Sequence, residues 1–236
     1  MNFDFDGLLL INKPSGPTSH DVVAKIRRTF RVDRVGHGGT LDPAATGLLL
    51  IMLGRATKLS ERLMGGDKTY AGTLRLGTTT SSQDLDGEIL SQTSVAGVER
   101  CHVEAGMQKL RGDIYQTPPM VSAVKIKGVP LYKMARKGQE VERQARLVHV
   151  YKFELTAWDF PAADPAFVVE CTKGTYVRTL VHDLGQDLGC GAALASLSRI
   201  ASGRYNVAQA ATLDEILAFT PDALRERVIP FAKIEV

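Results

Sequence analysis

Apolar residues along the chain predict short strands and helices. Residues 7–11 form an uninterrupted apolar run that stops at the turn-rich segment 12–17, which predicts a buried strand and a loop. Val22, Val23, Ile26 and Phe30 follow at helical spacing, which predicts a helix with Ser19 as its N-cap. Residues 68–77 alternate between polar and apolar side chains, which predicts a further strand.

The spacing of apolar residues also predicts strands and helices in the rest of the chain. Strands are expected at 147–158 and 166–171, as neighbours in one hairpin or sheet, and a last one at 228–236. Helices are expected at 44–59, 98–110, 131–137, 179–188 and 192–197. Strands and helices do not alternate as in βαβ units, so the pattern predicts a mixed α+β domain with a largely antiparallel sheet.

Composition excludes several classes of protein. The 236 residues are 44% hydrophobic and 23% charged, which is typical of a folded domain with a sizeable core. The longest apolar run, 48–53, is too short to cross a bilayer, and the first residues lack the basic character of a signal peptide. Three widely spaced cysteines without a C-x-x-C motif fit a reducing compartment and no zinc site. We therefore expect a cytoplasmic protein that binds neither metal nor membrane.

Charge is distributed unevenly along the chain. The net charge is +3, but residues 120–152 contain eight Lys or Arg and two Glu, a local net of +6. Residues 76–105 contain one Arg and five acids, a local net of −4. A polyanion bound along the basic segment explains this distribution, and a solvated basic loop explains it equally well.

Two segments carry candidate chemistry. The Gly-rich segment 36–43 lacks the signature of a P-loop or a dinucleotide-binding fold. Asp42 lies between this loop and Pro43, which keeps Asp42 out of helical geometry, so Asp42 is either a turn residue or a rigidly placed carboxylate. Tyr176 and Arg178 share one face if segment 173–178 is a strand. An arginine there either keeps a neighbouring carboxylate ionised or is solvated.

These segments together resemble the tRNA pseudouridine synthase B family over nearly the whole chain and in the family's order. The matching motifs are LINKPSGPTSH at 10–20, GHGGTLDPAATG at 36–47, LGRATK at 53–58, KTY at 68–70, QTPPMVSAVK at 116–125, LY at 131–132 and CTKGTYVRTL at 171–180. The resemblance implies the α+β pseudouridine-synthase fold, with a mostly antiparallel central sheet flanked by helices. It also implies one catalytic domain over 1–236, with a basic RNA-contacting insertion at about 116–148. The family's usual C-terminal RNA-binding domain is expected to be absent or vestigial.

The resemblance also implies an activity. Family members convert uridine 55 in the T-loop of tRNA to pseudouridine, by flipping the base out, breaking the C1′–N1 bond and joining C1′ to C5. This isomerisation implies no cofactor and no metal. The aspartate either adds covalently to the substrate or removes a proton to begin glycal formation, and the sequence leaves both routes open. The expected partner is the T-arm of tRNA, bound by a monomer.

Individual roles follow from the matched positions. Asp42 is expected to be catalytic and paired with Arg178, while Tyr70 stacks on the base. Tyr176 and Leu197 are expected to line the uracil pocket, and His37 to fill the gap left by the extruded base. The expected contacts with RNA phosphates are Lys13, Arg34, Lys125, Lys127, Arg143, Arg146 and Lys173.

The chain departs from the family pattern at several positions, one of which is a family histidine that is Ala193 here. The family's Thr-Asp-Thr segment reads Thr-Ser-Ser-Gln-Asp at 80–84, which leaves a local hydrogen-bonding role without its acid. Ser198 and Arg199 stand where two arginines are common, which predicts the loss of one RNA contact. Two other functions compete with a stand-alone synthase: an RNA-binding folding helper without catalysis, and a guide-RNA-dependent synthase, which the insertion disfavours.

Overall fold

The computed structural model describes residues 5–235, except 123, 127, 136–137 and 162–163. The chain forms two compact units. Unit 1 comprises Met1–Tyr70 and Leu197–Val236, and unit 2 comprises Ala71–Ser196. The chain passes from one unit to the other within β4 (Lys68–Leu76) and again within β12 (Ala192–Ser202).

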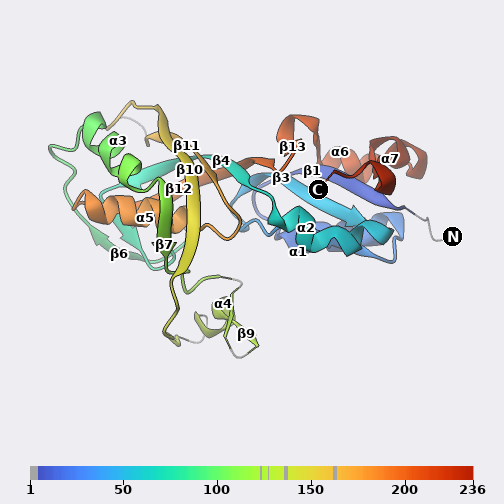
Figure 1. Cartoon of the computed structure of the whole chain (residues 1–236), viewed down its shortest axis with the longest axis horizontal. Helices are drawn as coiled ribbons and strands as arrows, with labels where there is room; N and C mark the ends of the chain where they lie inside the picture. The colour runs from blue at the N-terminus through green and yellow to red at the C-terminus, as the bar shows by residue number, and fades with distance from the viewer. Residues whose placement is uncertain (1–4, 123, 127, 136–137, 162–163, 236) are drawn as a thin grey trace. The chain divides into compact units, whose positions relative to one another are not determined.

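Unit 1 is built on a sheet with β1 near its centre (Figure 1). β1 pairs antiparallel with β3, from Gly7 opposite Leu53 to Lys13 opposite Gly47. β2 adds to β3, β14 and β15 add to β1, and the end of β12 runs parallel to β3. These strands are β1 (Gly7–Lys13), β2 (Val35–His37), β3 (Thr46–Leu53), β14 (Ala211–Thr212) and β15 (Ile229–Pro230), and β13 (Tyr205–Asn206) pairs with β12.

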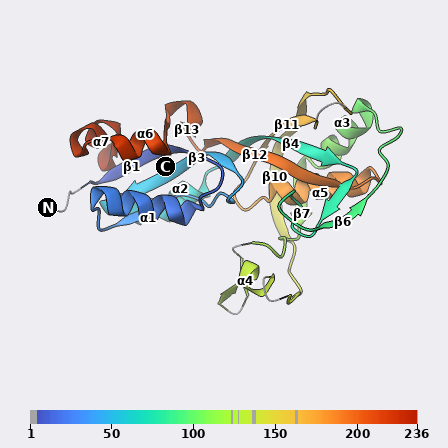
Figure 2. The ribbon, with the colours of Figure 1, turned by 180° about the vertical axis from the view of Figure 1, so that it is seen from behind.

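Both faces of the unit 1 sheet are covered. Leu9 and Ile51 belong to a core shared with α1, α6 and α7, whereas Leu8 and Leu50 belong to a second core shared with η1 and α2. Figure 2 shows α1 lying across the sheet strands. Burial on both faces explains why these strands are continuously apolar. The helices are α1 (Ser19–Phe30), η1 (Gly54–Leu59), α2 (Ser60–Gly65), η2 (Val207–Gln209), α6 (Leu213–Ala218), α7 (Pro221–Arg227) and η3 (Phe231–Lys233).

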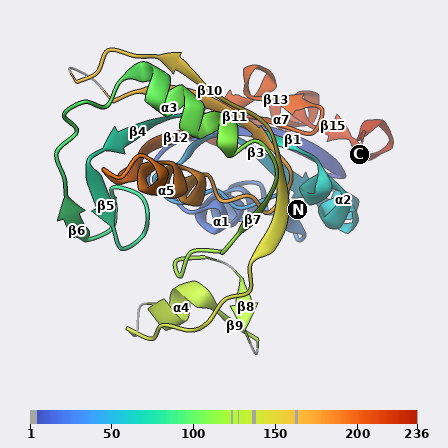
Figure 3. The same cartoon turned by 60° about the vertical axis from the view of Figure 1, so that its left-hand side comes forward.

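Unit 2 contains a sheet in the order β12-β4-β11-β10-β7. β10 is antiparallel to both of its neighbours, and α3 lies across it (Figure 3). Phe153 and Phe167 form an edge-to-face pair in the core, with ring centres 5.5 Å apart. The elements are β5 (Thr78–Thr80), β6 (Ile89–Gln92), α3 (Arg100–Lys109), β7 (Gly112–Gln116), β8 (Lys125–Ile126), β9 (Val129–Pro130), α4 (Leu131–Ala135), β10 (Arg146–Ala157), β11 (Ala166–Cys171) and α5 (Val177–Asp187).

The α+β class with a mostly antiparallel sheet is confirmed, and so are the strands β1, β4, β10 and β11. Two predicted helices are wrong: 44–59 is mainly the strand β3, and 192–197 is part of the strand β12. A strand that is apolar on both faces has no alternation, so its pattern cannot be told from that of a buried helix. The last strand, expected at 228–236, is only the short strand β15, and η3 follows it. Within the described residues, no helix is long and apolar enough to span a membrane.

Candidate active site

Asp42 lies on the loop that joins β2 to β3 in unit 1. Its side chain is exposed, while Leu41 and Ala45 on either side are each only 3% exposed and belong to the core beneath α1. The loop is anchored by backbone bonds, from Gly38 N to Leu50 O at 2.8 Å and from Ala45 N to Asp42 O at 3.1 Å. The fold therefore presents the carboxylate at the surface on a firmly seated backbone.

Lys13 lies beside this loop at the end of β1. Its side chain is fully buried, and Nζ donates to Pro14 O at 2.8 Å and to Pro43 O at 3.1 Å. Burial lowers the pKa of Lys13 to about 8, and the negative charge of Asp42 opposes that decrease. A phosphate contact by Lys13 stays a prediction, and in this structure the buried ammonium is directed at backbone carbonyls.

His37 ends β2 and is half-buried. Burial lowers the pKa of His37, and the positive charges of Arg199 and His20 lower it further. Its Nδ1 has no hydrogen-bond partner among the described residues. The imidazole is therefore neutral at neutral pH, which suits a ring that stacks or fills space better than one that binds a phosphate.

Two further predicted residues lie in unit 1 with Asp42. Tyr70 in β4 and Leu197 in β12 are both half-buried and pack against the core beneath α1. Thr46 Oγ1 donates to Leu197 O at 3.5 Å, next to the point where β12 pairs with β3. Both side chains keep exposed surface on a rigid strand, which a base-binding role requires.

Arg178 lies in the first turn of α5 in unit 2 and is 4% exposed. Its Nη1 donates to Asp84 Oδ2 at 3.2 Å, and its Nη2 to Val121 O at 2.9 Å. The hydroxyl of Ser82 donates to Asp84 Oδ1. The turn at 80–84 therefore supplies an acid after all, and the contact of Asp84 with Arg178 is one that the sequence analysis missed. The pairing of Arg178 with Asp42 stays a prediction.

Tyr176 is fixed by a second residue that the sequence analysis missed. The buried amide of Gln116 donates from Nε2 to Tyr176 O at 3.0 Å and accepts at Oε1 from Tyr176 N at 2.7 Å. These two hydrogen bonds fix the backbone of Tyr176, which lies two residues before Arg178. Gln116 is the first residue of the predicted insertion. Its position directly before the Thr-Pro-Pro turn at 117–119 is the sequence feature that could have pointed to it.

The predicted RNA-contacting residues fall into three groups. Arg34, Arg146 and Lys173 are exposed, as a phosphate contact requires. Arg143 is mostly buried, and its guanidinium donates to Pro118 O and Glu140 Oε1, both at 3.4 Å, so it links two parts of the segment 116–148. Lys125 contributes its backbone to β8, while its side chain and the whole of Lys127 lie outside what the structure describes.

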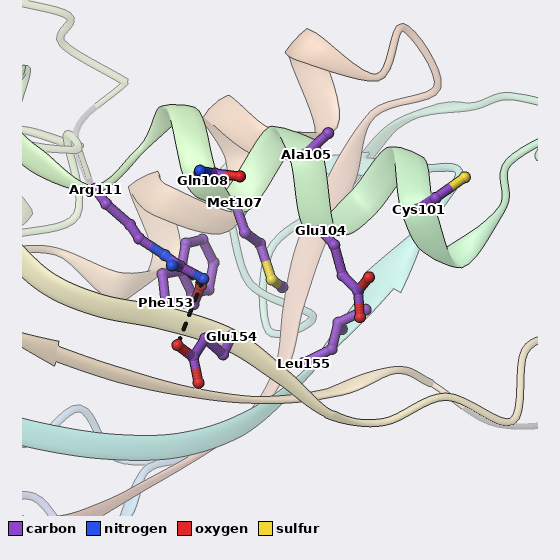
Figure 4. Close-up of a pocket in the computed structure, with 9 residues that line it drawn as sticks. All are labelled: Cys101, Glu104, Ala105, Met107, Gln108, Arg111, Phe153, Glu154 and Leu155. Carbon is purple, nitrogen blue, oxygen red and sulfur yellow. Dashed lines mark hydrogen bonds and ion pairs between the residues drawn. The ribbon is translucent and has the colours of Figure 1, made fainter.

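A pocket of about 470 Å³ lies elsewhere in unit 2, between α3 and β10 (Figure 4). Arg111 crosses it and donates to Phe153 O at 2.9 Å, with Glu154 3.6 Å away. It contains none of the predicted site residues. Over the described residues, no three His, Cys, Asp or Glu side chains gather as a metal site would need.

Comparison with known proteins identifies the family. Residues 27–177 match the TruB family pseudouridylate synthase N-terminal domain, and residues 178–234 match the tRNA pseudouridylate synthase B C-terminal domain. The chain therefore belongs to the TruB family of pseudouridylate synthases. It is 52% identical to tRNA pseudouridine synthase B of Opitutus terrae, over 96% of this chain and 93% of that protein. The Thermobifida fusca protein of the same name is 47% identical, over 94% and 78% respectively.

Solved structures agree with this assignment. The chain is 29% identical to a chain of a Cbf5-Nop10-Gar1 complex, with a TM-score of 0.75 over 96% of this chain. It spans 60% of the length of that chain. A structure of an H/ACA RNP bound to a substrate RNA is 26% identical, with a TM-score of 0.72 over 96% of this chain. The pseudouridine-synthase fold expected from the sequence is confirmed.

Proposed function

We propose that the protein is a tRNA pseudouridine synthase that isomerises uridine 55 in the T-loop. The observation that carries the proposal is the exposed carboxylate of Asp42 on a firmly anchored loop, within a chain of the TruB family. Lys13 Nζ donates to the carbonyl of the next residue, Pro43, and its positive charge interacts with Asp42. The relatives' shared name supports tRNA as the substrate.

The reaction is an isomerisation and needs no other reactant. The C1′–N1 bond breaks, the uracil turns, C1′ bonds to C5, the proton on C5 is lost and N1 gains one. The glycosidic bond of a stacked base is out of reach, so the base must first leave the stack. Asp42 then acts either as a nucleophile or as the base that begins glycal formation, and both routes require it ionised.

Other residues complete the proposed site. Tyr70 stacks on the flipped base, and Tyr176 and Leu197 line its pocket. Arg178 provides the counter-charge that the family resemblance assigns to it, oriented by Asp84. The neutral ring of His37 fills the space that the base leaves in the RNA. No step in this scheme calls for a cofactor.

Binding is proposed to rest on the folded shape of the T-arm. The exposed Arg34, Arg146 and Lys173 meet phosphates, and the segment 116–148 forms the RNA-contacting insertion. We propose a cytoplasmic enzyme, consistent with three cysteines that form no disulfide, and one that acts as a monomer.

The test is product mapping on an unmodified tRNA transcript, with wild type beside Asp42→Asn. Carbodiimide labelling and primer extension should stop at the T-loop uridine with wild type alone. Both proteins should bind the transcript. Binding without product from wild type would instead indicate an RNA-binding folding helper, and product only in the presence of a guide RNA would indicate the guide-dependent class.

A further inference from the structure

The backbone on both sides of Asp42 is bound by buried side chains from three separate elements. Gly39 O accepts from Arg199 of β12 at 3.1 Å. Leu41 is bound by Ser19 of α1, and Pro43 O accepts from Lys13 of β1. Alternate residues of the loop are therefore fixed, while the carboxylate between them stays exposed.

Ser19 makes the most specific of these contacts. Its hydroxyl accepts from Leu41 N at 2.9 Å and donates to Leu41 O at 3.2 Å, and the residue is 1% exposed. The Leu41 carbonyl belongs to the peptide plane that carries the amide of Asp42, so this bond sets the direction in which Asp42 leaves the loop. Ser19 is not occupied as a helix cap, because Thr18 fills that role.

Arg199 binds the loop from the sheet side. It is 1% exposed, and it donates from Nε to Leu48 O at 2.8 Å and from Nη2 to Gly39 O. Gly39 has a φ of +117°, which suits glycine, and a Cβ there would lie 3.3 Å from Nη1. Among the described residues, Arg199 donates these hydrogen bonds to backbone carbonyls, so this buried cation binds the loop and the adjoining strand β3.

We propose that Ser19 is a positioning residue for the catalytic Asp42, supported by Arg199, an inference that rests on the proposed function. The three contacts hold the carboxylate in its reactive alignment before the substrate binds. Without them, motion of the loop would disturb that alignment. Removing the hydroxyl leaves the buried Leu41 amide without its acceptor and lets the loop rotate. The effect falls on the chemical step, because the exposed RNA-contacting residues are untouched.

The test compares Ser19→Ala with Ser202→Ala. Ser202 is equally buried, at 1%, lies in the same unit, and its hydroxyl has no partner among the described residues. With enzyme in excess over tRNA, Ser19→Ala should slow single-turnover pseudouridine formation roughly ten- to a hundredfold. Its Kd for tRNA should stay within about twofold of wild type, and Ser202→Ala should match wild type in both.

Hydrogen exchange of the Leu41 amide gives a readout that does not depend on activity. Exchange should accelerate in Ser19→Ala and not in Ser202→Ala. Equal turnover in the two variants, a loss confined to tRNA binding, or a lower Tm with an unchanged rate would each overturn the inference. Absence of product from wild type would refute the proposed function instead. In that case unchanged exchange at Leu41 would refute the role of Ser19 in holding the loop backbone, and accelerated exchange would support that role.

Discussion

The ion pair between Arg178 and Asp84 makes a quantitative prediction. Asp84→Asn removes the charge at nearly constant shape, while Arg178 keeps the carbonyls of Ser82 and Val121 as acceptors. The two side chains are 5% and 18% exposed, and the closest atoms are 3.2 Å apart. Breaking a buried ion pair costs about 3–5 kcal/mol. Because Asp84 is partly exposed and asparagine keeps an acceptor oxygen, we expect a loss of about 2 kcal/mol in the free energy of unfolding.

That loss corresponds to a decrease in Tm of about 4–8 °C for a chain of this size. Turnover should also decrease, at a temperature well below both Tm values, because Arg178 would lose the group that orients it. The assays are thermal unfolding by circular dichroism and single-turnover pseudouridine formation. Asp86→Asn is the matched control, since Asp86 is exposed in the same turn. Equal Tm and equal turnover for the two variants would refute this role for Asp84.

Three further predictions test other contacts. Because the pKa of Lys13 is about 8, the single-turnover rate of wild type should fall as the pH rises through about 8. The rate of Lys13→Met should show no such fall, and parallel pH profiles for the two proteins would contradict this prediction. Because this folded-state pKa lies below the usual 10.5, the free energy of unfolding should rise between those two pH values in wild type only. Gln116→Leu removes both bonds to Tyr176 and should lower the free energy of unfolding by about 1–3 kcal/mol, measured in urea; an unchanged midpoint would refute that contribution. Affinity for tRNA should decrease with salt, and Arg146→Ala should reduce the slope of log K against log salt by about 1; an identical slope would exclude Arg146 as a phosphate contact.

The spacing of apolar residues predicts a helix or strand correctly where that spacing is typical of only one of the two. The helix α1 buries the apolar face that its spacing defines, and the strand β4 follows the alternation of polar and apolar side chains, with Leu74 and Leu76 buried and Arg75 between them exposed. The sequences of β3 and of the start of β12 predict helices wrongly, because most of β3 and the start of β12 are buried and lack alternation. Only pairing with distant strands distinguishes such runs from helices, and pairing is a property of the whole sheet.

The sequence predicts the site residues that belong to a motif. It predicts less well the residues whose burial and contacts depend on how the chain packs. Asp42 was found through its loop, but the buried positions of Lys13 and Arg199 were not, since a basic residue in a sequence looks like a phosphate contact. The sequence does not predict the contact of Asp84, because Asp84 follows the position that the acid of the family's Thr-Asp-Thr segment would occupy. Its relation to Arg178 spans 94 residues and arises only in the fold.

The central claim is that Asp42 drives rearrangement of one uridine in tRNA. The most direct measurement is release of tritium from tRNA labelled at C5 of its uridines, because joining C1′ to C5 must expel that atom. Wild type should release one equivalent per tRNA, and none from a transcript with cytidine at position 55, while Asp42→Asn should release none from either. Release by Asp42→Asn at the wild-type rate, or equal release from both transcripts with wild type, would contradict the account.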